Sequence, residues 1–311
     1  MKIYKRSNDT RDIFLELVAI AFLATGGIFV KVSALAPINT GLYRVLFSLP
    51  LLFPLAYKHL KYLTWKDTLV LFSAGVFLAG DIALWNLSFS YTSVANANLL
   101  TNLTPFTVIP VSCFLFKEKM PKYFLAGALV TLLGVFILIG SKMNTGASNY
   151  LGDFLAFCAS FFYASFLLIS YRLRERVKSS VIMFVSGFGS AAALFAFSAL
   201  IEGFQVPHGA DQLLPLLGLT VCLQVVGHNL LAHCQGKISV NLSSIICLSQ
   251  PAIATIYSFV IFDEKIALAE VAGIIIVIAG VYIVKAQYHT HWPSGRPEAA
   301  KEGEIEVLYD E

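Results

Sequence analysis

Two stretches of this sequence, 146 positions apart, decide the fold. Residues 93–119 read SVANANLLTNLTPFTVIPVSCFLFKEK, and residues 239–265 read SVNLSSIICLSQPAIATIYSFVIFDEK. One ungapped offset superimposes a Ser-Val pair, a proline, a serine and a Glu-Lys pair within these stretches. Apolar helices often match by chance, but shared hydrophobicity does not bring proline and Glu-Lys into register. The chain is therefore predicted to contain two related halves.

The composition indicates a membrane protein rather than a soluble one. Of the 311 residues, 57% are hydrophobic and only 13% are charged, which excludes ordinary soluble enzymes, nucleic-acid binders and disordered proteins. The formal net charge of +3 is too small to indicate a nucleic-acid partner. Five cysteines fall within apolar blocks without a C-x-x-C pair, so no disulfide framework or metal site is indicated. No cofactor motif is found either.

Apolar blocks of about 20 residues recur along the chain, and a helix needs this length to span a bilayer. We therefore predict an all-α integral membrane protein with ten transmembrane helices. Short linkers that carry most of the Lys and Arg residues separate the blocks. The expected spans are residues 13–33, 41–57, 68–90, 96–116, 123–141, 150–171, 180–201, 213–235, 239–262 and 268–285.

The basic residues predict the orientation of these spans. If the N-terminus is cytoplasmic, the inner segments hold nearly all Lys and Arg residues, and the outer loops hold only Lys142 and Lys265. Each half has five spans, an odd number, so the second half enters the membrane from the opposite side. The loop charges agree, because residues 117–119 (KEK) are net positive and their counterparts 263–265 (DEK) are net negative. The repeats are therefore expected to be inverted.

Four parts of the chain follow from this topology. A cytoplasmic N-terminus, 1–12, precedes the first five-helix repeat, 13–145. The second, inverted five-helix repeat is 146–286, and a cytoplasmic disordered tail, 287–311, is polar and ends in an acidic run. Inverted repeats are the architecture of many secondary transporters, which bind their substrate near the membrane midplane between the halves.

The repeated residues carry a resemblance to a known family. The sequence Tyr-Thr-Ser-Val-Ala at 91–95 precedes the fourth span, and several residues recur in both halves: Pro105, Glu118, Gly127 and Gly134, with Pro251, Glu264, Gly273 and Gly280. With these residues the chain resembles the drug/metabolite transporter (DMT) superfamily, and specifically its EamA-like ten-helix transporters, over residues 13–286. The resemblance implies an uncoupled or ion-coupled carrier of amino acids, amines, nucleosides, sugars or similar metabolites.

The resemblance is incomplete in one region. Gly26-Gly27 and Lys31 in the first span, and Arg44 in the second, are weaker matches to the family. The first two spans of the second half, within 150–201, lack an evident Gly-Gly pair and an intramembrane lysine. Equivalent roles are therefore not carried over to that part of the chain.

Asp81 is the strongest candidate for a substrate-binding residue. It lies past the middle of the third span, where an ionisable group is costly unless it faces protein or water. Trp85 follows by four residues and shares its helical face, and Asn86 is adjacent. A carboxylate beside a Trp ring suits an ammonium group, since both attract a cation. Alternatively, Asp81 pairs with a basic residue and holds helices together.

Further polar residues fall at cavity depth on other spans. Asn98 and Asn102 form one stripe on the fourth span, and Gln250 is on the ninth span before a proline. On the eighth span, Gln224 and His228 are four apart and share a face. Each is a candidate for substrate contact, but interhelical hydrogen bonding explains the amides equally well, and His228 can also make a structural hydrogen bond. As a further alternative, His228 or Asp81 exchanges a proton during transport.

Five other residues complete the candidate set. Tyr163 is the aromatic residue of the sixth span whose polar tip can reach a ligand. Pro105 and Pro251 each remove a backbone donor within a predicted span, so hinges are expected there. Lys31 and Arg44 are expected near the outer surface as gating residues, where they bind a substrate carboxylate, pair with Asp81 or anchor the helix ends.

These features predict a transporter that moves a small polar metabolite by alternating access in a bacterial inner membrane, as a monomer or homodimer, with or without a coupling proton. The preferred substrate is an ammonium-bearing compound: an amino acid, an amine or a quaternary ammonium compound. One alternative is an exchanger of organic anions or sugar phosphates, held by Lys31 and Arg44. Another is an intramembrane serine protease that uses Ser186 and His228, although the G-x-S-G form is missing.

Overall fold

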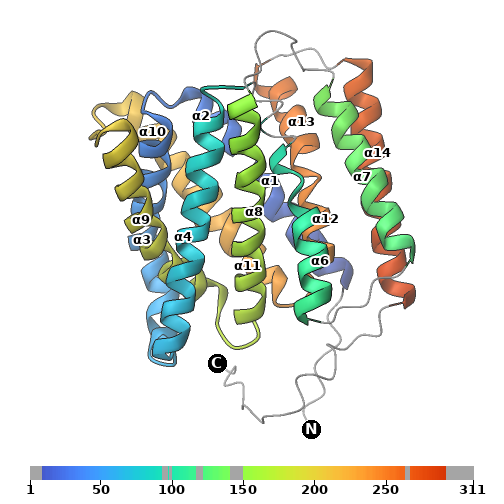
Figure 1. Cartoon of the computed structure of the whole chain (residues 1–311), viewed down its shortest axis with the longest axis horizontal. Coiled ribbons are helices and arrows are strands. Elements are labelled where there is room, and N and C mark those ends of the chain that lie inside the picture. The colour runs from blue at the N-terminus through green and yellow to red at the C-terminus, as the bar shows by residue number, and fades with distance from the viewer. Residues whose placement is uncertain are drawn as a thin grey trace.

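The computed structural model describes residues 9–92, 97, 100–116, 122–140, 150–262 and 267–291. All regular elements in these ranges are helices (Figure 1). They are α1 (Asp9–Ala24), α2 (Gly26–Val32), α3 (Pro37–Leu60), α4 (Trp65–Ser88), α6 (Thr104–Phe116), α7 (Lys122–Gly140), α8 (Tyr150–Leu173), α9 (Ser179–Phe197), α10 (Ala210–Gly218), α11 (Asn229–Gln235), α12 (Val240–Cys247), α13 (Gln250–Phe262) and α14 (Leu268–His291), with π-helical segments η1 (Ser198–Glu202) and η2 (Leu219–His228).

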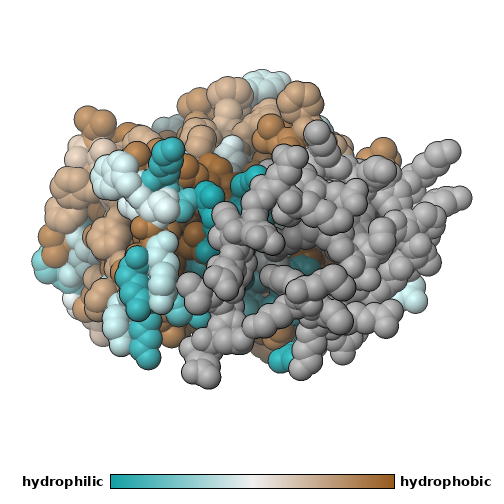
Figure 2. Space-filling model, turned by 90° about the horizontal axis from the view of Figure 1, so that it is seen from below, coloured by the Kyte–Doolittle hydropathy of each residue, from teal (hydrophilic) through white to brown (hydrophobic). Residues whose placement is uncertain are grey.

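Many of these helices are long and apolar enough to cross a bilayer. Seven candidate spans are Thr10–Val30, Pro37–Leu60, Trp65–Ser88, Tyr150–Leu173, Ser179–Glu202, Ala210–Gln235 and Val240–Ile261, and three shorter apolar helices are Thr104–Leu115, Leu125–Ile137 and Leu268–Val284. Large hydrophobic side chains such as Phe114, Leu200 and Tyr282 point outward. Seen from below, hydrophobic residues border the described part and hydrophilic ones gather toward the middle (Figure 2). The molecule is a multi-pass membrane protein.

The described helices overlap the expected spans, but several of their ends and breaks differ. α3 begins at Pro37, four residues before the expected start at Gly41, because proline is well suited to the first helical turn. The span expected over 239–262 is interrupted between α12 and α13. α14 continues to His291, six residues past the expected end of the last span at Lys285, and the tail over 287–311 stays a prediction.

α4 of the first half is held by very close packing against α8 and α9 of the second half. A Cβ atom on Gly75 would lie 1.9 Å from the carbonyl oxygen of Ser186, so only glycine allows this approach. The hydroxyl of Ser190 donates to the Gly75 carbonyl at 2.7 Å. Gly189 meets α4 in the same way, since a Cβ atom there would lie 2.1 Å from the Phe72 carbonyl oxygen. This backbone contact fixes the depth of the residues that follow on α4.

The last helices of the two halves, α7 and α14, pack along each other at one edge of the molecule (Figure 1). Gly134 lies against Val277, and Gly280 lies against Thr131. These glycines belong to the repeated set found in the sequence, and in each helix they let the partner backbone come close. Their recurrence is therefore explained by helix packing.

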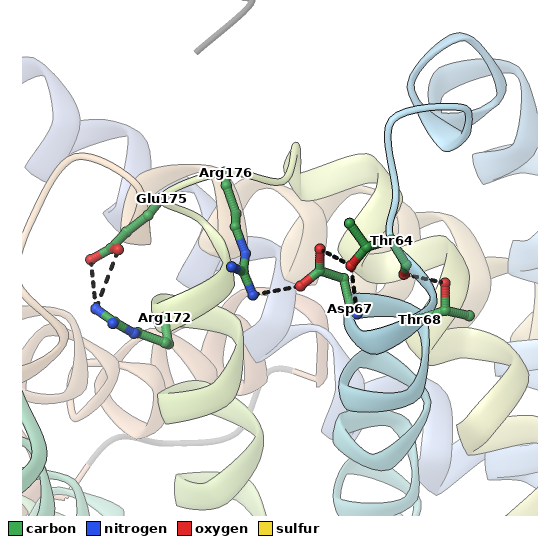
Figure 3. Close-up of polar contacts among 6 residues, drawn as sticks. All are labelled: Thr64, Asp67, Thr68, Arg172, Glu175 and Arg176. Atoms are coloured by element: carbon green, nitrogen blue, oxygen red, sulfur yellow. Dashed lines mark hydrogen bonds and ion pairs between the residues drawn. The ribbon is translucent and has the colours of Figure 1, made fainter. Parts of the chain in front are cut away.

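The end of the molecule where α1 begins, called the lower end here, is closed by polar contacts. Lys237 and Asp12 form an ion pair at 3.1 Å that joins the turn after α11 to α1. Arg176 and Asp67 are 2.5 Å apart, and Thr64 caps α4 by accepting a hydrogen bond from the Asp67 amide (Figure 3). Lys178 contacts His59 at 2.9 Å. Segments far apart in the sequence are thus joined at this end.

Replacing Gly75 by alanine is expected to destabilise the protein by about 1–3 kcal/mol, the usual cost of overpacking. The added methyl group would meet backbone rather than a side chain that can move. The matched control is Gly140→Ala, because a Cβ atom at Gly140 meets nothing within 4 Å. Thermal unfolding in detergent micelles measures both. Equal unfolding midpoints for the two variants would contradict this account of the α4 packing.

Candidate functional site

A cavity of about 140 Å³ opens between helices of both halves, in the part of the molecule away from the lower end. A single buried water needs only about 10–15 Å³, so the cavity can hold a small solute. Its walls come from the junction of α1 and α2, the later part of α4 and the first residues of α6 and α13. Single positions on α3 and α8 and two positions each on η2 and α12 complete them. Nine of the residues singled out in the sequence line it: Arg44, Asp81, Trp85, Asn102, Pro105, Tyr163, His228, Gln250 and Pro251.

Asp81 and Trp85 enter the cavity together from α4. Four residues correspond to slightly more than one helical turn, so both side chains project from the same face. Gly80 places α4 against α8, because a Cβ atom there would lie 2.4 Å from the ring of Phe162. The Trp85 ring packs edge-on against Phe89 with 4.7 Å between centroids. Packing on both sides therefore sets where the carboxylate and the indole lie.

Arg44 faces the same cavity from α3 and is 4% exposed. It lies deeper than expected, because α3 starts four residues early and four residues add about 6 Å of helix. Its Nε atom has no hydrogen-bond partner among the described residues. Arg44 and Asp81 attract each other electrostatically, but within the described part of the chain no direct ion pair joins them. The cavity thus contains a cation and an anion that are both available to a solute.

His228 adds a hydrogen-bonding group of defined direction. Its Nδ1 atom lies 3.1 Å from the carbonyl oxygen of Leu223, and since a carbonyl can only accept, Nδ1 donates. In the neutral ring Nε2 is then an acceptor. The rings of Tyr163 and Phe166 each lie 6.4 Å from the imidazole and meet it at steep angles. These aromatic contacts hold the imidazole at the cavity wall.

Two interrupted helices meet the cavity at the repeated prolines. α12 ends at Cys247 and α13 begins at Gln250, with Pro251 in its first turn. α6 likewise begins at Thr104, directly before Pro105. Each proline thus lies in the first turn of a new helix rather than mid-helix, where its missing N–H costs nothing, and the hinges at Pro105 and Pro251 stay a prediction. Both helices therefore direct the positive end of their dipole toward the cavity.

Polar contacts across the cavity tie the two halves together. The Gln250 side-chain amide donates to the carbonyl oxygen of Leu23 at 3.5 Å, near the end of α1. The hydroxyl of Tyr257 donates to the Ala21 carbonyl at 3.2 Å. α13 of the second half is thus attached to α1 of the first by hydrogen bonds from side chains. Such hydrogen bonds separate and re-form more readily than close backbone contacts.

Four predicted site residues are not brought into the cavity by the described structure. Asn86 is buried elsewhere and donates to the Pro37 carbonyl at 2.8 Å, because five residues after Asp81 is well off its helical face. Gln224 is buried but does not line the cavity. η2 is π-helical, so residues five apart lie on the same face. Leu223, five residues before His228, therefore lines the cavity together with His228. Asn98 lies outside the described residues, and of Lys31 only the backbone, in α2, is described.

Further residues lie at or near the site. Thr101 and Thr104, on the polar face of the fourth span, and Ser244, on that of the ninth, line the cavity. Cys247 also lines it, and no sequence pattern distinguished this cysteine from the others. Glu16 is a different case. It is a fully buried carboxylic acid within the first span, and the rule that identified Asp81, that intramembrane ionisable groups are costly, applies to it as well.

The family comparison now identifies the protein at the level of its class. The EamA-like transporter family matches residues 10–140 and again residues 150–286. The chain belongs to the EamA-like transporter family. It is therefore a transporter and not an enzyme. The serine protease alternative also lacks structural support, because Ser186 is fully buried and its hydroxyl contacts the Met183 carbonyl of its own helix.

Individual relatives agree with this family. An uncharacterized transporter of Clostridium kluyveri is 26% identical over 87% of this chain and 91% of that protein. A probable amino-acid metabolite efflux pump of Salmonella typhimurium is 21% identical over 60% of this chain and 66% of that protein. A solved crystal structure with 18% identity superimposes with a TM-score of 0.75, covering 91% of this chain and 99% of the other, so the fold is shared.

The electrostatic coupling of Arg44 and Asp81 can be measured without any substrate. Arg44→Gln and Asp81→Asn are each expected to lower the unfolding midpoint, because each leaves one buried charge uncompensated. The double variant should be less destabilised than the sum of the two, with a coupling of about 0.5–3 kcal/mol. As a control, Arg44→Gln combined with Asp211→Asn, an exposed position on α10, should be additive. Additivity in both pairs would refute the coupling.

Proposed function

We propose that this protein is a secondary transporter of small ammonium-bearing solutes and that amino acids are its preferred class. The observation that carries the proposal is the cavity in which Arg44 and Asp81 face a common space, with no direct ion pair between them in the described part of the chain. A free amino acid has a carboxylate and an ammonium group on one carbon. It therefore matches a site that offers a cation and an anion at the same time.

The anionic end of such a solute has two sources of attraction in this cavity. Arg44 supplies a guanidinium that is buried and can bind a carboxylate through two parallel hydrogen bonds. The first turns of α6 and α13 also border the space, and helix N-termini favour negative charge. Transporters that use interrupted helices commonly direct helix N-termini at an anionic substrate group.

The cationic end has a complementary set of acceptors. Asp81 contributes a carboxylate, and Trp85 on the same face contributes the ring that best attracts cations. The Nε2 atom of His228 is a further acceptor for an ammonium N–H. The remaining walls include Leu23, Ile82 and Leu248, which supports a solute with an apolar side chain. The name of the Salmonella relative, an amino-acid metabolite efflux pump, supports the same class.

For the architecture we propose ten spans in two inverted five-helix repeats, 13–145 and 146–286, that rock about the cavity. Two separate matches to one family support the repeats, and the equivalent prolines Pro105 and Pro251 lie in one cavity wall. Transport would alternate access between the two membrane faces. A cytoplasmic position of 1–12 and of the chain end, a bacterial inner membrane, and a monomer or homodimer complete the proposal.

Transport by the purified protein in proteoliposomes tests the substrate class. Asp81→Asn should reduce the uptake of amino acids and amines at least about 30-fold. The variant removes the carboxylate that pairs with the ammonium group of the solute, and the loss of one partner of a buried charge pair costs roughly 2 kcal/mol or more. Arg44→Gln should reduce amino acid uptake but spare amines that have no carboxylate. Asp211→Asn, exposed on α10, is the matched control and should transport as the wild type does.

Two outcomes would reject the proposed class. Unchanged amine and amino acid uptake by Asp81→Asn would remove the role of the carboxylate. Transport of sugar phosphates or other organic anions that depends on Arg44 but not on Asp81 would establish the anion exchanger instead. A thermal-shift screen of the purified protein against amino acids, polyamines, choline and sugar phosphates gives an independent measure, because a bound ligand stabilises the folded protein.

Reporter fusions test the topology. Green fluorescent protein fused after residue 311, and in a second fusion before residue 1, should fluoresce in a bacterial host in both cases, because both ends are proposed to be cytoplasmic. Alkaline phosphatase at the same positions should be inactive, since it needs the oxidising periplasm. Opposite results for the two ends would mean an odd number of spans and would exclude the paired five-helix repeats.

A further inference from the structure

Below the cavity, α1 carries the carboxyl group of Glu16, which is 0% exposed. Its Oε1 atom accepts a hydrogen bond from the hydroxyl of Ser243 on α12, which is also fully buried. Its Oε2 atom is buried and has no partner among the described residues. Glu16 therefore joins the first half of the chain to the second through one hydrogen bond and has one oxygen unsatisfied.

Among the described residues, the surroundings of Glu16 offer no cation to balance a negative charge. Lys237 is paired with Asp12, one turn lower on α1, at 3.1 Å. Arg174 donates to the carbonyl oxygens of Ala232 and Val177. Elements that pack against α1 carry these titratable or charged groups: Cys247 of α12, Cys234 and His233 of α11, His228 and Cys222 of η2, Tyr257 of α13 and Lys31 of α2. α1 itself carries Asp12 and Arg11, whose side chain is exposed and five residues from Glu16, and Tyr163 of α8 lies beyond. In the part of the chain that the structure describes, no ion pair reaches the Glu16 carboxyl group.

An ionised carboxylate is very costly in such a place. It would lie inside a membrane span, out of water, with a single hydrogen bond and without a cation. The neutral acid avoids the cost of burying a charge. The neutral acid is therefore the form of Glu16 that these surroundings favour.

The position of Glu16 connects this proton to the cavity. Leu23, which lines the cavity, is seven residues further along α1, so Glu16 lies about 10 Å below it. Ser243 is next to Ser244 and one turn from Cys247, which both line the cavity. The Glu16–Ser243 contact is thus beneath the cavity floor, and the Asp12–Lys237 pair lies beneath the contact.

We propose that Glu16 is a proton-binding site that couples transport to a proton, separate from the substrate-binding groups in the cavity. This inference rests on the proposed transport function. Opening the lower end separates α1 from α11 and α12, breaks the Glu16–Ser243 hydrogen bond and admits water. The O–H bond of the acid then breaks, the proton passes to water, and the carboxylate is hydrated. Reprotonation from water must precede closure, so a high pH at the lower face favours the open state.

The variant Glu16→Gln tests this step, because an amide can accept the Ser243 hydrogen bond but cannot release a proton. In proteoliposomes, wild-type protein should accumulate an amino acid above equilibrium when a pH gradient is imposed. Glu16→Gln should lose this accumulation, while exchange of labelled for unlabelled amino acid continues to be measurable. Glu16→Asp should restore the response to the gradient at least in part.

Glu270→Gln is the matched control, because Glu270 is also a buried glutamate but lies in the first turn of α14, away from the cavity. It should keep the response to the pH gradient. A wild-type protein that only equilibrates the amino acid under every gradient, or a Glu16→Gln variant that still accumulates it, would overturn the proposal.

Infrared spectroscopy tests the proton without any substrate. The pH-difference spectrum of the wild type in lipid should contain the carbonyl stretching band of a buried protonated carboxylic acid, and this band should be missing from Glu16→Gln but present in Glu270→Gln. If the band is the same in the wild type and Glu16→Gln, Glu16 is not the proton-binding group. If the band behaves as expected but no amino acid is transported, the proton site stands and the proposed substrate class fails.

Discussion

The cost of placing charge inside a bilayer governs this structure. Hydrocarbon offers no hydrogen bonds, so every ionisable group within a span must be surrounded by protein, a partner charge or water. Arg44 and Asp81 meet this requirement together, because α3 and α4 bring them to one polar cavity between apolar helices. The close contact of α4 with α9 at Gly75 keeps Asp81 at that depth. Without this backbone contact the carboxylate would have no fixed place relative to the guanidinium.

A multi-pass helical protein could be predicted from the sequence, because hydrophobic length is a property of many residues at once. Trp85 could be placed beside Asp81 since α4 is a regular helix, and four residues share a face there. The same rule misplaced Gln224, because η2 is π-helical and residues five apart come together. Arg44 was expected near the surface because the predicted span began at Gly41. α3 begins at Pro37 instead, and this local detail of the helix terminus places Arg44 deeper.

Other features depend on contacts that no single-sequence pattern contains. The prolines at 105 and 251 indicated a disturbance of the helix, but whether a proline bends a helix or starts a new one depends on which carbonyl groups find partners nearby. The burial of Asn86 follows from its hydrogen bond to the Pro37 carbonyl, a partner 49 residues away. Glu16, in contrast, could have been found from the sequence, because it is an ionisable residue within a predicted span. Only the structure identifies its hydrogen-bond partner, Ser243.

The carboxyl groups of Asp81 and Glu16 differ in a way that suits them to different tasks. Asp81 faces a cavity that also contains a cation, so its charge can be balanced before and after a solute binds. Glu16 faces packed helices and one hydroxyl, so its charge can be balanced only by a proton or by water. A solute-binding anion needs a cation nearby, whereas a proton-binding acid needs surroundings without one. A single residue cannot have both environments. Separating them by the cavity floor allows the opening of the lower end to change the state of Glu16 while Asp81 keeps its place on the rigid part of α4.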